Sequence, residues 1–224
     1  MKGEKEKGFV LFIIGASGSG KTSLLNELAK RGFIEPTLKF ADREKRNKDD
    51  DIEHFSAGRF MEDAPFYYQM NNQFYAFEPF ALFKEVSKGK RKGMILSNTL
   101  TIKNIKGMAR QTGYDIDFKV IAIEHDLKKE NVLPNRNDPA SRLRSFAHIQ
   151  EDIETKRNLD KKFLQGKISF DDVRRFSPID YIFQKQESVE KLADMVIAEL
   201  KDDALTLEEK LILKRIKTKN QRLI

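Results

Sequence analysis

Residues 15–22 of the chain read GASGSGKT and fit the phosphate-loop pattern Gly-x-x-x-x-Gly-Lys-[Ser/Thr] in full. An apolar run at 9–14 precedes this segment and a helical pattern follows it, which is the context that the pattern requires. Glycines let backbone N–H groups curl around a phosphate, and the positive end of the helix dipole points to the same place. The segment therefore predicts a site for a nucleoside triphosphate, against the alternative of a glycine-rich turn that binds nothing.

The residue types in this loop suggest separate roles. The ammonium of Lys21 suits the β- and γ-phosphates, and the hydroxyl of Thr22 suits Mg²⁺. ATP and Mg²⁺ are thus the expected cofactors, and Lys21 is expected to act in catalysis. We assign binding of the triphosphate to Gly15, Ala16, Ser17, Gly18, Ser19, Gly20, Lys21, Thr22 and Ser23. Nothing in these residues identifies the group that receives the phosphate.

Two groups of arginines follow short apolar runs, at positions where ligands bind along the edge of an open α/β sheet. Arg43 and Arg46 are three residues apart, so on a turn or short helix both guanidinium groups can hold one phosphate. Arg136, Arg142 and Arg144 surround a proline-bearing loop that leads into a long helical pattern. Arginines on such a lid would meet the charge that develops during phosphoryl transfer. For each group, a solvated surface is the alternative.

Residues 66–83 are unusually rich in Phe and Tyr. Packing of a small subdomain against the sheet explains such a stretch; the alternative is that one or two rings, Tyr75 or Phe77 first, stack on a base. The three histidines lie far apart in a chain without cysteine, which argues against a zinc site. The acidic pairs near 49–51 and 171–172 are typical of turns and helix caps.

The elements that would position these residues alternate along the chain. Short apolar runs typical of buried strands, the last of them the weakest, occur at 9–14, 94–97, 118–124, 179–183 and 34–40. Helical patterns separate them at 22–31, 77–89, 101–113, 141–159 and 188–200. Such alternation implies right-handed crossovers and a parallel sheet covered on both faces. We therefore predict an α/β P-loop NTPase fold with a mainly parallel five-stranded sheet, a small acceptor-binding subdomain and a lid.

Several further segments, taken with the loop, resemble guanylate kinases in their order and approximate spacing. They are ADREKR (41–46), IEHFSAGRF (52–60), NNQFYAF (71–77), GKRKGMILSN (89–98), the arginine-bearing lid helix, and the closing stretch at 176–200. The resemblance covers roughly residues 8–200. It implies that Arg43 and Arg46 hold the phosphate of the acceptor nucleotide, with Arg43 also acting in catalysis. It also implies that Arg136 and Arg142 are catalytic arginines of the lid.

The chain departs from this family where the acceptor base is read. The Tyr-Gly-[Thr/Ser] stretch that helps recognise guanine appears here as Tyr75-Ala76-Phe77, and the family's strand ending in Asp-x-Asp reads Ser97-Asn98-Thr99. A tyrosine that commonly helps bind the acceptor phosphate is replaced by Glu53. We retain Tyr75, Phe77 and Asn98 as expected acceptor-binding residues, but GMP itself is in doubt as the acceptor.

The expected function is ATP- and Mg²⁺-dependent phosphoryl transfer to GMP, dGMP or a related nucleoside monophosphate. An alternative keeps the donor site and changes the acceptor to a modified deoxynucleotide, a DNA base or a sugar phosphate. A third alternative is a catalytically weak, guanylate-kinase-like binding module.

Charge and length suggest the remaining organisation. Six Lys or Arg and no acidic residue lie in 210–224, so most of the net charge of +7 belongs to this end of the chain. A solvated end is favoured over a nucleic-acid contact there, and a homodimer is an open alternative. The expected boundaries are a kinase domain at 1–204, an acceptor subdomain at about 41–78, a lid at about 131–145, an insertion at about 157–176 and a basic amphipathic tail at 205–224. Without cysteine or a long apolar run, we expect a cytoplasmic protein and no membrane contact.

Overall fold

Five parallel strands form the central sheet of the computed structural model, which describes residues 8–16, 18–41, 54–56, 66–70, 73–96, 98–125, 139–201 and 206–220. The strands are β1 (Phe9–Gly15), β2 (Glu35–Pro36), β7 (Arg91–Ile95), β8 (Asp117–Glu124) and β9 (Tyr181–Gln184). Their order is β2-β7-β1-β8-β9, so β1 lies at the centre, between β7 and β8. Every residue of β1 is buried, as expected for a parallel strand covered on both faces.

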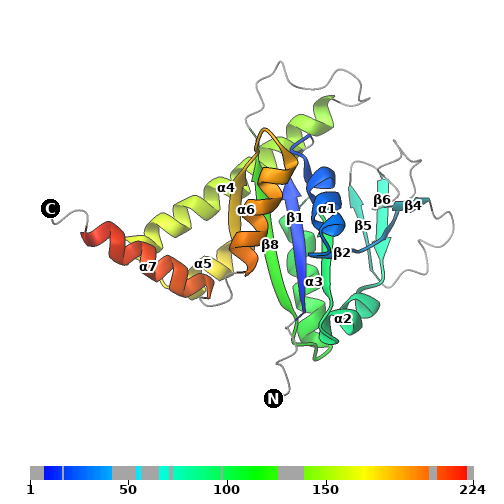
Figure 1. Cartoon of the computed structure of the whole chain (residues 1–224), viewed down its shortest axis with the longest axis horizontal. Helices are drawn as coiled ribbons and strands as arrows, with labels where there is room; N and C mark the ends of the chain where they lie inside the picture. Colours follow the sequence, from blue (N-terminus) through cyan, green and yellow to red (C-terminus); the bar gives the residue numbers. More distant parts are fainter. Residues whose placement is uncertain are drawn as a thin grey trace.

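Helices cover both faces of this sheet (Figure 1). Phe12 and Ile14 of β1 point into a core formed with α2 (Pro79–Ser87), α3 (Thr99–Gln111) and α4 (Pro139–Leu164). Their neighbours Leu11 and Ile13 point the other way, into a core formed with α1 (Lys21–Lys30) and α6 (Val189–Lys201). The alternation of side chains along a strand thus supplies two separate cores. The predicted fold class is confirmed.

A second sheet of four strands lies beside the first. It contains β3 (Lys39–Ala41), β4 (His54–Ser56), β5 (Phe66–Met70) and β6 (Gln73–Phe77), in the order β4-β3-β6-β5. The prediction of one strand at 34–40 was wrong, because β2 belongs to the central sheet and β3 to the second one. Pro36 ends the short edge strand, where its missing N–H costs no interior ladder bond, and Leu38 between the two strands is exposed.

The segment after residue 157 forms helices. α4 continues five residues past its predicted end, and α5 (Phe170–Phe176) follows it. The terminal helix α7 (Leu207–Asn220) packs on them through a small core of Phe163, Val173 and Leu211 (Figure 1). Leu211 of the terminal helix thus docks on this domain, whereas Ile212, one residue later, is 38% exposed.

Capping explains the start of α5. The Ser169 hydroxyl accepts a hydrogen bond from the backbone N–H of Asp172, and the Asp172 carboxylate accepts one from the backbone N–H of Ser169. The Ser169 hydroxyl also donates to the Asp172 carboxylate, and this bond, followed by the one from the Ser169 N–H, holds the pKa of the Asp172 carboxyl below its usual value. The prediction that the acidic pair at 171–172 serves as a cap is confirmed.

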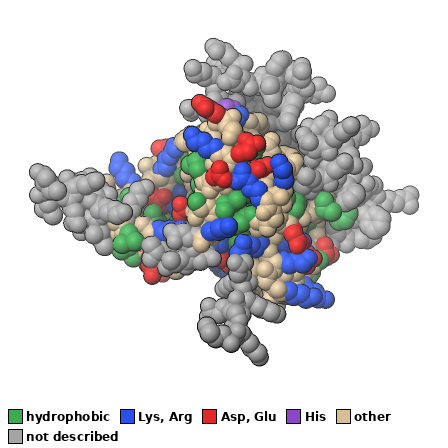
Figure 2. Space-filling model, viewed as in Figure 1, with side chains coloured by type: hydrophobic (Ala, Val, Ile, Leu, Met, Phe, Trp, Pro, Cys, Tyr) green, Lys and Arg blue, Asp and Glu red, His purple; other side chains and the backbone are tan. Residues whose placement is uncertain are grey.

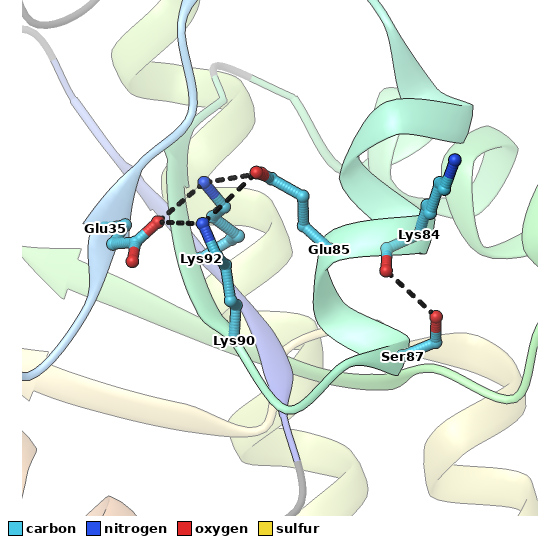
Figure 3. A network of polar contacts seen from close by, with 6 residues as sticks. All are labelled: Glu35, Lys84, Glu85, Ser87, Lys90 and Lys92. Atoms are coloured by element: carbon cyan, nitrogen blue, oxygen red, sulfur yellow. Dashed lines mark hydrogen bonds and ion pairs between the residues drawn. The ribbon is translucent and has the colours of Figure 1, made fainter.

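A charged network joins β2, α2 and β7 near the start of β7 (Figure 3). The ammonium of Lys92, a buried residue, lies 2.9 Å from a Glu35 carboxylate oxygen and 2.6 Å from one of Glu85. Lys90 bridges the same two carboxylates at 3.3 Å each. Hydrogen bonding to Lys92 is the largest cause that lowers the pKa of both glutamates. The network holds the edge strand β2 to the rest of the sheet.

We expect acid to weaken this network. A carboxylate whose pKa is lower in the folded than in the unfolded state contributes stability above its unfolded pKa, and this stability is lost as the pH falls through the folded pKa. From pH 5 to pH 3, Tm should therefore fall less in Lys92→Met than in the wild-type chain. The difference should be roughly 1 to 3 °C, because both glutamates are about half exposed. The exposed Lys88→Met is the control, and equal acid slopes in all three proteins would contradict the prediction.

Candidate active site

The phosphate loop connects the carboxyl end of β1 to the first turn of α1. Gly18 and Gly20 have φ angles of 84° and 90°, in the left-handed region that favours glycine. Gly20 is the N-cap of α1 and has no side chain that could accept a hydrogen bond. The first N–H groups of the helix therefore point toward the loop without a side-chain acceptor. This arrangement of backbone suits an anion.

Lys21 bends back over the loop. Its ammonium donates hydrogen bonds to the carbonyl oxygens of Gly15, at 2.9 Å, and Ala16, at 2.7 Å. The side chain therefore lies close to the backbone of the loop, and these two acceptors are neutral. Since an anionic phosphate is a stronger acceptor than a carbonyl, these bonds can be exchanged for bonds to a ligand. Thr22 and Ser23 follow in the same helical turn, Thr22 partly buried and Ser23 exposed.

The interior of the loop contains an unsatisfied hydroxyl. Ser19 is fully buried, and its Oγ has no hydrogen-bond partner among the residues that the structure describes. A Cβ on Gly15 would lie 2.6 Å from that Oγ and 2.8 Å from the carbonyl oxygen of Ile123, which explains why glycine is required there. Buried polar groups normally have partners. This hydroxyl lies next to the first N–H groups of α1, so both could donate hydrogen bonds to phosphate oxygens. The residues present therefore fit a triphosphate.

A hollow lies next to the loop, at the carboxyl ends of β8 and β9. It has a volume of 310 Å³, and its lining residues are Glu124, His125, Gln184, Lys185, Gln186 and Glu187. Lys185 connects the two features, because its ammonium donates to the Gly18 carbonyl oxygen at 3.2 Å. Glu124 is buried and accepts hydrogen bonds from Arg157 and Gln184. Sequence reasoning missed this hollow, although the polar run QKQE after the last predicted strand marks its place.

The residues expected to bind the acceptor are described only in part. Ser17 of the loop, together with Arg43, Arg46 and Arg136, lies outside the described residues. Arg142 falls in α4, whose first turns are described by backbone alone. The roles given to these residues stay predictions.

Burial limits what the two expected aromatic residues can do. Phe77 is 1% exposed and packs in the core of the central sheet, with its ring against the edge of Phe66. Tyr75 is 4% exposed. These environments favour the packing alternative, most clearly for Phe77. Asn98 is the N-cap of α3, and its side-chain oxygen accepts a hydrogen bond from the Thr101 N–H at 2.7 Å.

Lys39 is a buried cation that sequence reasoning missed. It is 4% exposed, and its ammonium reaches from β3 in the second sheet to the Ile95 carbonyl oxygen at the end of β7, at 2.6 Å. The same ammonium lies 6.0 Å from the centre of the Tyr75 ring. Lys39 thus joins the second sheet to the strand next to the phosphate loop. A single lysine in the run PTLKF gives no local signal of this contact.

Within the described ranges, no group of three or more His, Cys, Asp or Glu residues is placed to hold a metal ion. A nucleotide-bound Mg²⁺ does not need such a group, because phosphate oxygens, water and one or two protein oxygens complete its shell. Thr22 fits that description. Across the same ranges, no helix has both the length and the apolar character needed to cross a bilayer.

The order β2-β7-β1-β8-β9, with the phosphate loop after the central β1, defines a P-loop NTPase fold. The solved structure of a guanylate kinase from Anaplasma phagocytophilum is similar to it, with a TM-score of 0.57 and 16% identity over 91% of this chain and 90% of that chain. An APS kinase from Mycobacterium tuberculosis, solved with AMPPNP and APS, matches with a TM-score of 0.39 and 16% identity over 88% of this chain and 99% of that one.

No family model matches the chain, and no curated protein matches its sequence. The likeness to the guanylate kinase is one of shape, at an identity where only the fold is shared. The chain accordingly has a guanylate-kinase-like P-loop kinase fold.

Proposed function

We propose that the chain is an ATP- and Mg²⁺-dependent kinase that phosphorylates a nucleoside monophosphate. The observation that carries this proposal is the phosphate loop, with Lys21 close to its backbone and a buried Ser19 hydroxyl that has no partner among the described residues. The second sheet adds support, since Lys39 holds it against the end of β7, the strand beside the loop. Transfer of a phosphoryl group between two phosphates requires a donor site and a second binding surface next to it for the acceptor.

In this mechanism the loop N–H groups and Lys21 bind the donor phosphates. Mg²⁺, when bound, neutralises charge on the phosphate oxygens, and Thr22 is the residue that would hold it. Arg43 and Arg46 would orient the acceptor phosphate, while Arg136 and Arg142 would stabilise the charge of the transition state. An acceptor phosphate oxygen attacks the γ-phosphorus in line, the bond to the β-phosphate oxygen breaks, and ADP leaves. No covalent intermediate with the protein is needed.

An ADP-release assay with the full chain tests this function. The common ribo- and deoxynucleoside monophosphates are offered one at a time with Mg·ATP, and at least one should raise ADP release well above the rate without an acceptor. If none does so, while Mg·ATP still stabilises the protein against heat, the binding-module alternative replaces the kinase. If Mg·ATP gives no stabilisation, the donor site itself is rejected.

An acceptor other than GMP is the second candidate, favoured by the burial of Phe77 where a guanine-reading residue was expected. In the face drawn in Figure 2, Lys and Arg side chains are interspersed with Asp and Glu over the described surface. The signature of a DNA acceptor would be activity that falls steeply with salt, whereas phosphorylation of a free nucleotide should depend on salt only weakly.

A further inference from the structure

Asp152 of α4 lies at the carboxyl edge of the central sheet. Its carboxylate Oδ2 accepts a hydrogen bond from the Thr99 hydroxyl at 3.1 Å, and Thr99 is the first residue of α3, just past the end of β7. Ile149, three residues earlier on the same face of α4, is buried in one core with Leu96 and Ile14. Leu96 directly follows β7, and Ile14 is the penultimate residue of β1. This turn of α4 therefore shares a core with the end of β1, the strand that leads into the phosphate loop.

Two of the other carboxylates described on α4 and at the end of β8 form ion pairs with cations. Glu124, at the end of β8, pairs with Arg157, and Asp160, two turns along α4, pairs with the buried Lys156. Asp152 differs, because among the described residues its one hydrogen-bond partner is a neutral hydroxyl and it makes no ion pair. Burial is the main cause that raises the pKa of its carboxyl, and the Thr99 bond lowers it in part. Lys103 of α3 and His148 of α4 also lower this pKa through their charge, but neither forms an ion pair with Asp152 among the described residues. A partly buried carboxylate without a direct ion pair is a candidate for a role toward a cationic ligand.

A P-loop kinase needs such a carboxylate near this point. In P-loop NTPases an acidic residue acts with the loop Ser or Thr to hold Mg²⁺. In this chain the residues that follow β7 read Leu96-Ser97-Asn98-Thr99 and contain no acid. Asn98 carries the cap of α3, and Thr99 presents its hydroxyl to Asp152. The residues after β7 thus lack a carboxylate, but Asp152 places one beside Thr99. It comes from α4, more than fifty residues later in the chain.

We propose that Asp152, oriented by Thr99, is a positioning residue that orders the water shell of the nucleotide-bound Mg²⁺. This inference rests on the proposed donor site, with Thr22 as the direct ligand and Asp152 acting through water. The competing explanation is structural: a carboxylate near the start of α3 interacts favourably with the helix dipole and ties α4 to α3. The two explanations predict different effects on Mg²⁺-dependent ATP binding when Asp152 is replaced by a neutral side chain of the same shape.

The test measures the affinity of the full chain for ATP by calorimetry, once with EDTA and once with saturating Mg²⁺. Asp152→Asn keeps an oxygen that can accept from Thr99, so the fold should be retained. We expect it to reduce the Mg²⁺-dependent gain in ATP affinity by about tenfold or more while leaving the affinity in EDTA within about twofold. Glu151→Gln, the same loss of charge on the adjacent exposed residue, should behave as wild type.

Thr99→Val adds a second measurement. Because the carboxylate remains but loses its orienting hydroxyl, the Mg²⁺-dependent gain should fall to a value between those of Asp152→Asn and wild type. A wild-type gain in Asp152→Asn would overturn the inference and leave the kinase proposal intact, as would a variant that lost only thermal stability. Failure of the wild-type chain to bind ATP under either condition would instead reject the donor site on which both rest.

Discussion

Replacing Lys21 with alanine is expected to lower kcat/KM for phosphoryl transfer by about 10²- to 10³-fold, the scale set by removal of one preorganised charged donor from a transition state. In the structure the Lys21 ammonium lies close to the backbone of the phosphate loop and bonds the Gly15 and Ala16 carbonyl oxygens. No other described side chain of the loop carries a positive charge. Its loss would leave the developing charge on the transferred group without this neutralisation.

The stability of the ligand-free chain should change little in Lys21→Ala, because the lost bonds are made to carbonyl groups at a partly exposed loop. The thermal shift caused by Mg·ATP, however, should shrink with the loss of affinity. Lys30→Ala is the matched control. This lysine lies on the same helix with its side chain 81% exposed, and its contact with Glu27 is long, at 3.9 Å. Activity of Lys21→Ala within tenfold of wild type would contradict the role assigned to the loop.

Replacing Asp160 with alanine should produce the largest loss of stability. The Lys156 side chain is 2% exposed, and its ammonium lies 2.5 Å and 2.7 Å from the two Asp160 carboxylate oxygens. Removing one member of such a pair leaves a buried charge without compensation, which costs about 3–5 kcal/mol. For a chain of this length the Tm should fall by roughly 10 °C. Urea unfolding and thermal melts measure both quantities.

A second substitution separates the cost of the stranded charge from loss of packing. In Lys156→Met/Asp160→Ala no ammonium remains to be desolvated, so most of the stability should return. Glu154→Ala, which removes an exposed carboxylate 3.8 Å from Arg157 on the same helix, should cost less than about 1 kcal/mol. If the double variant were as unstable as Asp160→Ala, packing rather than charge would explain the loss.

Much of the fold was predictable because its signals are local. The alternation of apolar runs and helical patterns specified the parallel sheet, and the full pattern at 15–22 specified the phosphate loop between strand and helix. The one strand predicted wrongly shows the limit of this reasoning. The sequence of residues 34–40 does not indicate that its two halves belong to different sheets. Only the strand pairing shows this, because Glu35 pairs with Lys92 in the central sheet and Phe40 pairs with Ala76 in the second sheet.

For the proposed site, the sequence contains a local pattern only on the donor side. A motif whose residues are adjacent in the chain carries its own geometry, as Gly20 and Lys21 show. The side chains that complete the edge of the sheet come from distant segments, and each looks like an ordinary surface residue in the sequence. Their positions become clear only from long-range contacts: Lys39 bonds Ile95, Asp152 bonds Thr99, and Lys185 bonds Gly18.

By itself, then, the sequence specified a P-loop, the expected phosphate site, at the end of a buried strand, since the spacing of glycines, lysine and threonine dictates backbone conformation over a few bonds. Only the tertiary structure decided which cations and carboxylates surround that site. Parallel strands bring their carboxyl ends to one edge through crossovers of dozens of residues, and a helix such as α4 places Asp152 there by packing Ile149 and Ile153 into the core. Long-range packing, which no local pattern encodes, positions the rest.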